Sequence, residues 1–255
     1  LKSAAVDPKG RFLAQAITPT GAQSGPAALL RTLIRQARGY EARLGGPAKA
    51  AVVGLPGAID PNRGVVLLPG RLKNLEGYPL VPKLSKALKI PVLADNDARL
   101  AMVAEKEYGL ARGIKWALTI TLGTGVGSGV LLDGRILRDP HLQFGTQASH
   151  MILQARHGRL CFTGARGTAE MLCSATALAS QVRDGLLRGI PSSLSSRFTK
   201  DPASIDAAAV FEAARRKDRL CLDELGVWTE HLACFLISAI HAYSPLHNLR
   251  PGTQY

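Results

Sequence analysis

The amino-acid sequence predicts an α/β protein whose later part is richer in helix. Three observations support this prediction. Apolar runs of strand length alternate with segments of helical periodicity through the first half of the chain. Glycine and proline mark several of the junctions between these segments. After residue 168, apolar positions recur every three or four residues, which is typical of amphipathic helices.

The amino-terminal residues predict a β-hairpin followed by a helix. Residues 3–6 and 12–17 have strand-like patterns and flank a turn at residues 7–10, Asp-Pro-Lys-Gly. Residues 27–44 then place leucine, isoleucine and alanine at helical spacing, opposite several arginines.

A strand, a helix and a second strand follow. Residues 50–55 form a continuous apolar run that stops at Pro56-Gly57, which is typical of a buried parallel strand entering a tight loop. Residues 81–88 predict a short helix, and residues 90–94 form another strand-like run. This alternation predicts an α/β sheet.

The next elements surround a predicted domain boundary near Arg112-Gly113. A helix over residues 98–108 stops at Gly109, and a strand over residues 114–122 begins after the boundary. The boundary divides the chain into a small α/β domain at 1–112 and a larger α/β domain at 113–255.

The larger domain is expected to become helical in its second half. Residues 130–132 and 135–137 flank Asp133-Gly134, a strong hairpin signal. Helices are predicted over residues 168–185, 206–216 and 220–243.

Composition limits the classes of partner. The 255 residues allow one large domain or two smaller ones. The 32 lysines and arginines exceed the 19 acidic residues, which gives a net charge of +13 and would suit a polyanion. However, the basic residues are scattered along helical faces, and no block is longer than residues 215–217. We therefore expect no nucleic-acid partner.

The sequence also predicts a cytoplasmic protein that does not enter a membrane. The longest apolar stretches, residues 116–122 and 232–240, are shorter than the roughly 20 residues of a membrane span. No amino-terminal segment has the charged and then apolar order of a signal peptide. The four cysteines form no C-x-x-C pair, and we expect reduced, packed thiols.

Asp97 is the first candidate for chemistry. It lies just after the apolar run at residues 90–94, and strand ends are where open α/β sheets meet their ligands. A carboxylate there could take a proton from a hydroxyl. Asp is also among the preferred helix N-caps, and Asp97 taken by itself favours that interpretation. Asp95 and Asn96 have the same two interpretations.

A glycine-dense run at residues 122–129 is the second candidate. Glycine permits concave backbone conformations that bulky residues forbid, so the run could present N–H groups and hydroxyls to phosphate. The P-loop pattern G-x-x-x-x-G-K-[ST] is missing from the chain. A hairpin turn or bulge is the equally favoured alternative. Together with Asp97, the run suggests phosphoryl transfer.

Three further polar residues are ambiguous when read alone. Gln147 and His150 lie close together, and a lone histidine is more often structural than a ligand or base. Glu170 lies in a helix-compatible stretch, where solvent exposure is the default. His150, His157 and Cys161 provide too few ligands for a closed zinc site, which needs four.

These fragments occur in the order of motifs of one family. The chain resembles the ROK family (repressor, open reading frame, kinase) from about residue 3 to residue 245. Six segments carry the resemblance, and their order makes it specific. They are residues 54–60 (GLPGAID), 74–78 (NLEGY), 95–98 (DNDA), 122–127 (LGTGVG), 150–151 (HM) and 210–215 (VFEAAR).

The resemblance implies a two-domain actin-like ATPase (ribonuclease H-like) fold and phosphorylation of a hexose or N-acetylhexosamine by ATP with Mg²⁺. Asp97 would be the general base, and Asn96 would hold a neighbouring hydroxyl. Family members are commonly homodimers. The other implied sugar-binding residues are Gly57, Gln147, His150 and Glu170, and the implied phosphate-binding residues are Gly123, Thr124, Gly125 and Gly127.

The sequence departs from the family pattern in four places. Gln147 replaces a sugar-binding glutamate, and Cys161 is the one survivor of a zinc-binding cysteine cluster, so we expect no structural zinc. The family's first phosphate loop is expected before Leu1, and its adenosine loop is expected after Pro245, where residues 246–255 do not resemble it.

These departures keep two alternatives to a kinase open. One is a noncatalytic sugar-binding regulator, although the helix-turn-helix domain of such regulators is not within these residues. The other is a degenerate kinase that binds sugar without turnover.

Overall fold

The structure is a computed structural model that describes residues 1–68, 72, 74–138, 147–161 and 163–243. Its contacts divide the chain into two compact units. The first contains Leu1–Gly113 and, later in the chain, Arg138. The second contains Ile114–Leu137 and the described residues from Gln147 onwards. The sequence predicted one boundary near Arg112-Gly113, and this prediction did not include the return of the chain to the first unit at Arg138.

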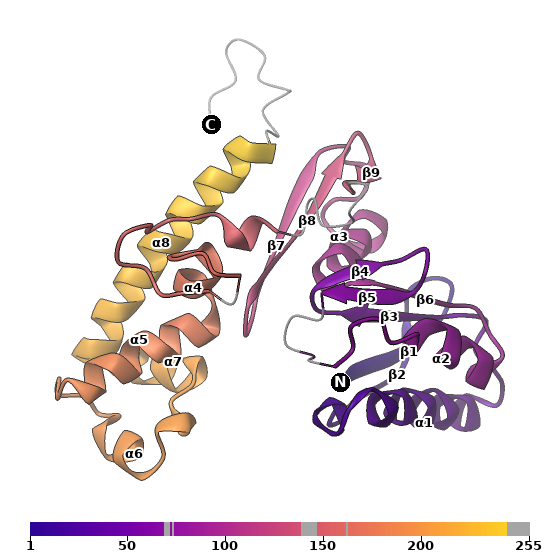
Figure 1. The fold of residues 1–255 in the computed structure, drawn as a ribbon, viewed down its shortest axis with the longest axis horizontal. Helices are drawn as coiled ribbons and strands as arrows, with labels where there is room; N and C mark the ends of the chain where they lie inside the picture. The colour runs from indigo at the N-terminus through magenta and orange to yellow at the C-terminus, as the bar shows by residue number, and fades with distance from the viewer. Residues whose placement is uncertain (69–71, 73, 139–146, 162, 244–255) are drawn as a thin grey trace. The chain divides into compact units, whose positions relative to one another are not determined.

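The strands of the first unit form three pairs (Figure 1). One pair is parallel and two are antiparallel, and the order along the chain agrees with an α/β protein. The antiparallel pair β4–β5 was not predicted. The pairs are β1 (Lys2–Val6) with β2 (Phe12–Ile17), β3 (Ala51–Leu55) with β6 (Val92–Asn96), and β4 (Ala58–Asp60) with β5 (Val65–Leu68).

The parallel pair β3–β6 is buried on one face only. Val53 and Ala94, which are paired in register, point into the core. Val52 and Leu93 are also paired, but they are 59% and 62% exposed. The prediction of a buried strand at residues 50–55 is therefore wrong for the face that carries Val52, because this side chain and its partner Leu93 remain exposed.

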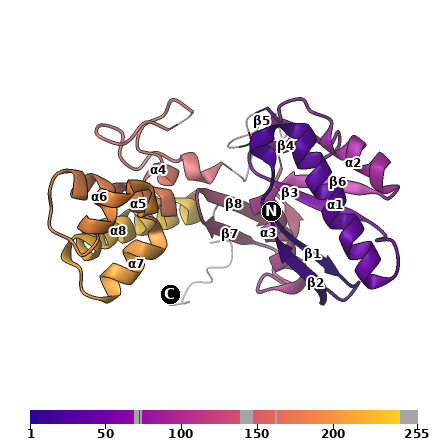
Figure 2. The same cartoon turned by 90° about the horizontal axis from the view of Figure 1, so that it is seen from below.

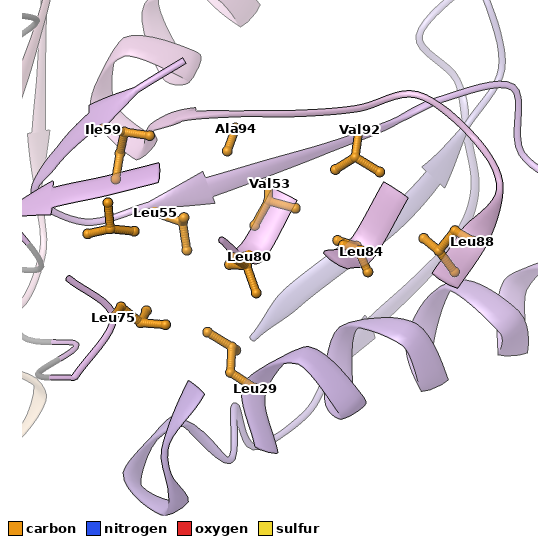
Figure 3. Packing of buried hydrophobic residues seen from close by; sticks show 11 residues of the cluster. Leu29, Val53, Leu55, Ile59, Leu75, Leu80, Leu84, Leu88, Val92 and Ala94 are labelled. Atoms are coloured by element: carbon orange, nitrogen blue, oxygen red, sulfur yellow. The ribbon is translucent and has the colours of Figure 1, made fainter. Parts of the chain in front are cut away.

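Two helices supply the other half of this core (Figure 3). Helix α1 (Pro26–Leu44) has proline in its first turn and ends at Gly45, whose φ of 76° suits a left-handed C-cap. Helix α2 (Leu80–Leu88) buries three leucines at helical spacing. Burial of each such side chain stabilises the fold by about 1.5–3 kcal/mol. The side chains shared by the strands and helices include Leu29, Val53, Leu55, Ile59, Leu75, Leu80, Leu84, Leu88, Val92 and Ala94.

The second unit begins with a three-stranded antiparallel sheet. Strand β7 (Ala117–Leu122) pairs with β8 (Val126–Leu132), which pairs with the short β9 (Arg135–Ile136). Asp133 and Gly134 have φ values of 48° and 73°. Two positive values are typical of a type I′ turn, so the predicted hairpin is confirmed.

Five α-helices follow within the described part of this unit, and α5, α7 and α8 pack together (Figure 2). The single helix predicted over residues 168–185 is wrong, because Ser174 has an extended backbone and accepts a hydrogen bond from Ala177 N at 3.0 Å. Ser174 therefore caps a new helix. The helices are α4 (Ala169–Cys173), α5 (Ala175–Leu187), α6 (Ser195–Lys200), α7 (Ala207–Arg215) and α8 (Arg219–Tyr243).

Helix α8 is the longest of the described helices. Its 25 residues make it, among the helices of residues 1–243 that the structure describes, the one that is long and apolar enough to span a membrane by length and composition. Core helices pass the same test, and Phe235 and Ala239 are fully buried in the second unit. The other buried residues of the helix are Leu220 and Cys221, near its start. Counting uninterrupted apolar runs did not identify it, because polar residues interrupt the run.

Candidate active site

The junction between β6 and α3 (Asp97–Tyr108) places the first candidate residues. Asn96 is the N-cap, and its Oδ1 accepts hydrogen bonds from Ala98 N at 2.9 Å and Arg99 N at 3.2 Å. Asp97 is the first helical residue instead. The interpretation of Asp97 as the N-cap is therefore wrong, because Asn96 has the extended backbone that a cap residue adopts.

The Asp97 carboxylate is consequently not used as the cap. Asp97 is exposed, whereas its neighbours Asn96 and Ala98 are buried. Oδ1 accepts a hydrogen bond from Ala98 N at 2.9 Å. Partial removal from water raises the pKa of the Asp97 carboxyl, and this outweighs the lowering by the backbone hydrogen bond. A raised pKa makes the carboxylate a better proton acceptor.

Gly57 lies beside this junction. The Asn96 Nδ2 donates a hydrogen bond to the Gly57 carbonyl oxygen at 2.9 Å. Gly57 follows β3 and has a φ of 91°, a left-handed conformation that favours glycine. The structure thus brings together Gly57, Asn96 and Asp97, three of the residues singled out in the sequence.

A buried ion network beneath the junction was not predicted. Arg99 is fully buried, and its Nε donates to Asp95 Oδ1 at 2.8 Å while its Nη2 lies 2.7 Å from the same oxygen. The guanidinium also donates to Ile59 O at 3.3 Å, and Arg138 forms an ion pair with the other Asp95 oxygen. Buried charges persist when they are paired. In the sequence, the four-residue spacing of Asp95 and Arg99 is the feature that could have indicated this ion pair.

The glycine-dense run forms the hairpin turn between β7 and β8. Gly123, Thr124 and Gly125 connect the strands, and Gly127 lies within β8 opposite Thr121. None of the glycines in this run has a left-handed φ, so the turn is not formed by the left-handed conformations that glycine alone adopts readily. A Cβ on Gly123 would meet no atom within 4 Å, so the outside of the turn is open at this position.

Hydrogen bonds from the α4–α5 junction fix this turn. Ala175 N donates to Gly123 O at 2.9 Å, and Thr176 Oγ1 donates to Thr124 O at 2.7 Å. Both carbonyls are thereby occupied. The N–H of Gly125 has no acceptor among the residues that the structure describes. Such an N–H group could donate to a phosphate oxygen.

Glu170 contacts the other side of the turn. It lies in the first turn of α4, and its Oε2 accepts a hydrogen bond from Val126 N at 3.1 Å. The family resemblance implied that Glu170 binds the sugar, and no sequence pattern indicated its contact with the glycine turn. The separation of 44 residues between Glu170 and Val126 explains why no local pattern could show this.

His150 and Gln147 lie in the same unit as Glu170. His150 ends the 3₁₀ helix η2 (Ala148–His150), which Gln147 precedes, and its Nδ1 is 3.8 Å from Cys161 Sγ. Burial lowers the pKa of His150, and the Glu170 charge opposes this effect. His150 is therefore predominantly neutral at pH 7. Thr146, which directly precedes Gln147, lies outside the described residues.

The described parts of the chain contain no group of three or more His, Cys, Asp and Glu side chains arranged to hold a metal ion. Cys161 and His150 together supply two ligands, fewer than a structural zinc site requires. The expectation of no structural zinc stays a prediction that elemental analysis of the purified protein can test.

The fold is that of sugar kinases and their regulatory relatives. The ROK hexokinase of Thermus thermophilus is similar over 96% of this chain and 75% of its own, with a TM-score of 0.73 and 26% identity. A ROK family transcriptional regulator, a homologue of the E. coli MLC protein, is similar over 95% of this chain and 60% of its own, with a TM-score of 0.77 and 26% identity.

Sequence comparison gives the family. Residues 1–247 match the ROK family, and the chain belongs to it. The resemblance drawn from the six motifs is thus confirmed. A glucokinase of Thermotoga maritima is 30% identical over 94% of this chain and 74% of its own length. An N-acetylmannosamine kinase of Salmonella newport is 32% identical over 73% of this chain and 62% of its own length.

Proposed function

We propose that the protein is a sugar kinase that transfers the γ-phosphoryl group of ATP to a hydroxyl of a hexose or N-acetylhexosamine. The observation that carries the proposal is the Asp97 carboxylate, which Asn96 leaves out of the helix cap and whose pKa is raised. Relatives named glucokinase and N-acetylmannosamine kinase support the same substrate class.

In the proposed reaction, Asp97 accepts the proton of the attacking sugar hydroxyl. The hydroxyl oxygen forms a bond to the γ-phosphorus, the bond to the bridging oxygen breaks, and ADP leaves with that electron pair. Asn96 uses Oδ1 for the cap and one Nδ2 hydrogen for Gly57. Its amide has a second Nδ2 hydrogen, which could hold a neighbouring sugar hydroxyl.

The phosphates of ATP are assigned to the glycine turn. Gly123 leaves the outside of the turn open, the Gly125 N–H is available to an acceptor, and Thr124 adds a hydroxyl. Gly127 has no side chain that would block the approach along β8. Mg²⁺ would arrive with the nucleotide and neutralise part of its charge.

The sugar is assigned to Gly57, Gln147, His150 and Glu170 in addition to Asn96 and Asp97. A neutral His150 can accept or donate a hydrogen bond, depending on its tautomer. Gln147 can bond a hydroxyl, although less strongly than the glutamate that the family pattern has there. Glu170 provides a carboxylate acceptor, which pairs strongly with hydroxyl donors.

The proposed kinase function also carries expectations for the domain fold, the oligomeric state and the location of the protein. We infer that the two units correspond to the two domains of an actin-like ATPase fold of ribonuclease H type, expected at 1–112 and 113–255. We expect a cytoplasmic homodimer that binds no nucleic acid through these residues and does not enter a membrane. Light scattering of the purified protein tests the dimer.

A noncatalytic sugar-binding regulator is the second candidate function. The solved ROK family transcriptional regulator supports it, because its 26% identity and TM-score of 0.77 equal or exceed those of the hexokinase. A degenerate kinase would also bind sugar without phosphorylating it.

Sugar-dependent ADP release separates these functions. The purified protein is mixed with ATP, Mg²⁺ and either glucose or N-acetylmannosamine, and ADP is measured with a coupled assay. A kinase releases ADP only when sugar is present. Calorimetric binding of sugar without ADP release would contradict the kinase and support a regulator or a degenerate kinase.

A further inference from the structure

The contact between Glu170 and the glycine turn assigns a role to Glu170 beyond sugar binding. Val126 is 5% exposed, so its N–H is a buried donor that needs an acceptor. Glu170 Oε2 supplies it at 3.1 Å. Removing the carboxylate would leave this donor unsatisfied at the first residue of β8, directly after the turn.

The same carboxylate explains why residue 125 lacks a side chain. A Cβ on Gly125 would lie 2.6 Å from Glu170 Oε2. Gly125 has no left-handed φ, so alanine at this position would not be forced into a left-handed conformation. The obstacle is the end of a flexible side chain, which would have to move and thereby lose its hydrogen bond from Val126.

We infer that Glu170 is a positioning residue, which holds the glycine turn in the shape that receives the phosphates of the nucleotide. The inference rests on the proposed function for the identity of the ligand. The negative charge of Glu170 would by itself repel a phosphate. Any gain in ATP affinity therefore comes from the acceptor oxygen that holds Val126 N and not from the charge. Glutamine keeps an acceptor oxygen and removes the charge, whereas alanine removes both.

Calorimetry of ATP with Mg²⁺ binding to the full chain tests this role. We expect Glu170→Ala to weaken ATP binding about tenfold, and Glu170→Gln to bind ATP at least as well as the parent. Glu230→Ala, at an exposed position of α8, is the matched control and should leave the affinity unchanged. A residue that contacts sugar alone would change the affinity for glucose and leave the affinity for ATP as it was.

A double-mutant cycle with Gly125→Ala gives the sharper result. Gly125→Ala should weaken ATP binding to a similar extent as Glu170→Ala, and the double variant should be no weaker than either single variant. The added methyl group costs little once the carboxylate that it displaces is gone. Additive losses would overturn the inference.

Exchange of the Val126 amide hydrogen separates failure of the inference from failure of the proposed function. We expect faster exchange in Glu170→Ala and Gly125→Ala, with slow exchange kept in Glu170→Gln. Unchanged exchange in Glu170→Ala would overturn the positioning role even if the protein is a kinase. If the parent protein binds no ATP, the proposed function fails, and the exchange rates still decide whether Glu170 holds the turn.

Discussion

The Asn96 side chain donates a hydrogen bond of 2.9 Å to the carbonyl oxygen of Gly57 while its own oxygen accepts from the backbone of α3. One amide thus connects the loop after β3 with the start of α3. Because Asn96 takes the capping role, the next carboxylate, that of Asp97, remains available. In the motif Asn96-Asp97, Asn96 is therefore the structural residue and Asp97 is the proposed base.

Replacing Asn96 should destabilise the first unit. Asn96→Ala removes the cap and the bond to Gly57, and we expect a loss of about 1–3 kcal/mol in the free energy of unfolding. Asn96→Asp keeps a capping oxygen and loses the donor, so it should lose less. Urea unfolding measures both, with Asn62→Ala in an exposed loop as the control. Equal stability of Asn96→Ala and the control would contradict this role.

The buried pair of Asp95 and Arg99 predicts a larger effect. Arg99→Met leaves Asp95 without its buried partner, although Arg138 still contacts the other oxygen, and we expect a loss of about 3–5 kcal/mol. In urea unfolding, the double variant Asp95→Asn with Arg99→Met should lose less than the sum of the single variants. Arg63→Met is the control, because Arg63 is exposed. A strictly additive result would show that the pair is not coupled.

Local patterns predicted most of the elements, and long-range contacts explain the errors. Residues 27–44 and 220–243 carry enough helical periodicity to predict α1 and α8 nearly to the residue. The break at Ser174 was missed because apolar spacing continues across it, although serine is a common cap.

The candidate site shows the same limit. Asp97 and the glycine turn were visible as motifs, but the role of Asn96 as the cap became clear only from its extended backbone and its hydrogen bonds to Ala98 N and Arg99 N. The contact of Glu170 with Val126 depended on packing between residues 44 apart. Periodicity and spacing contain no information on such contacts.

Asp218 should make the second unit sensitive to acid. Although burial raises its pKa, hydrogen bonds from Cys221 N, Ser193 and Ser192 lower it far below the usual range. The unfolded chain binds a proton near pH 3.9 and the folded chain does not, so this stabilisation is present above about pH 4 and is lost as the pH falls below it.

Asp218→Asn tests this dependence. The variant should be less stable than the parent at pH 7 and should lose less of its stability between pH 5 and pH 3, measured by urea unfolding. Asp133→Asn is a matched control, since Asp133 is exposed and Asn-Gly suits the same turn. Parallel acid profiles for Asp218→Asn and the parent would contradict the assignment.

The rate of phosphoryl transfer should depend on pH through Asp97. The base works when deprotonated, so kcat/KM should fall as the pH decreases through the pKa of Asp97. Partial burial raises that pKa, and the acidic limb should lie above the ordinary aspartate value of about 3.9. Initial rates of ADP release over a pH series, at pH values where the protein stays folded, give the limb. A limb at or below the ordinary value would be inconsistent with the raised pKa.

Asp97→Asn tests the central claim most directly. The substitution keeps the shape of the side chain and removes its ability to take a proton. We predict that kcat for glucose-dependent ADP release falls by about 10²–10⁴-fold, while glucose affinity measured by calorimetry stays within about threefold of the parent. Glu107→Gln, at an exposed position of the same helix, should keep the parent rate. An Asp97→Asn variant that releases ADP at the parent rate would contradict Asp97 as the general base.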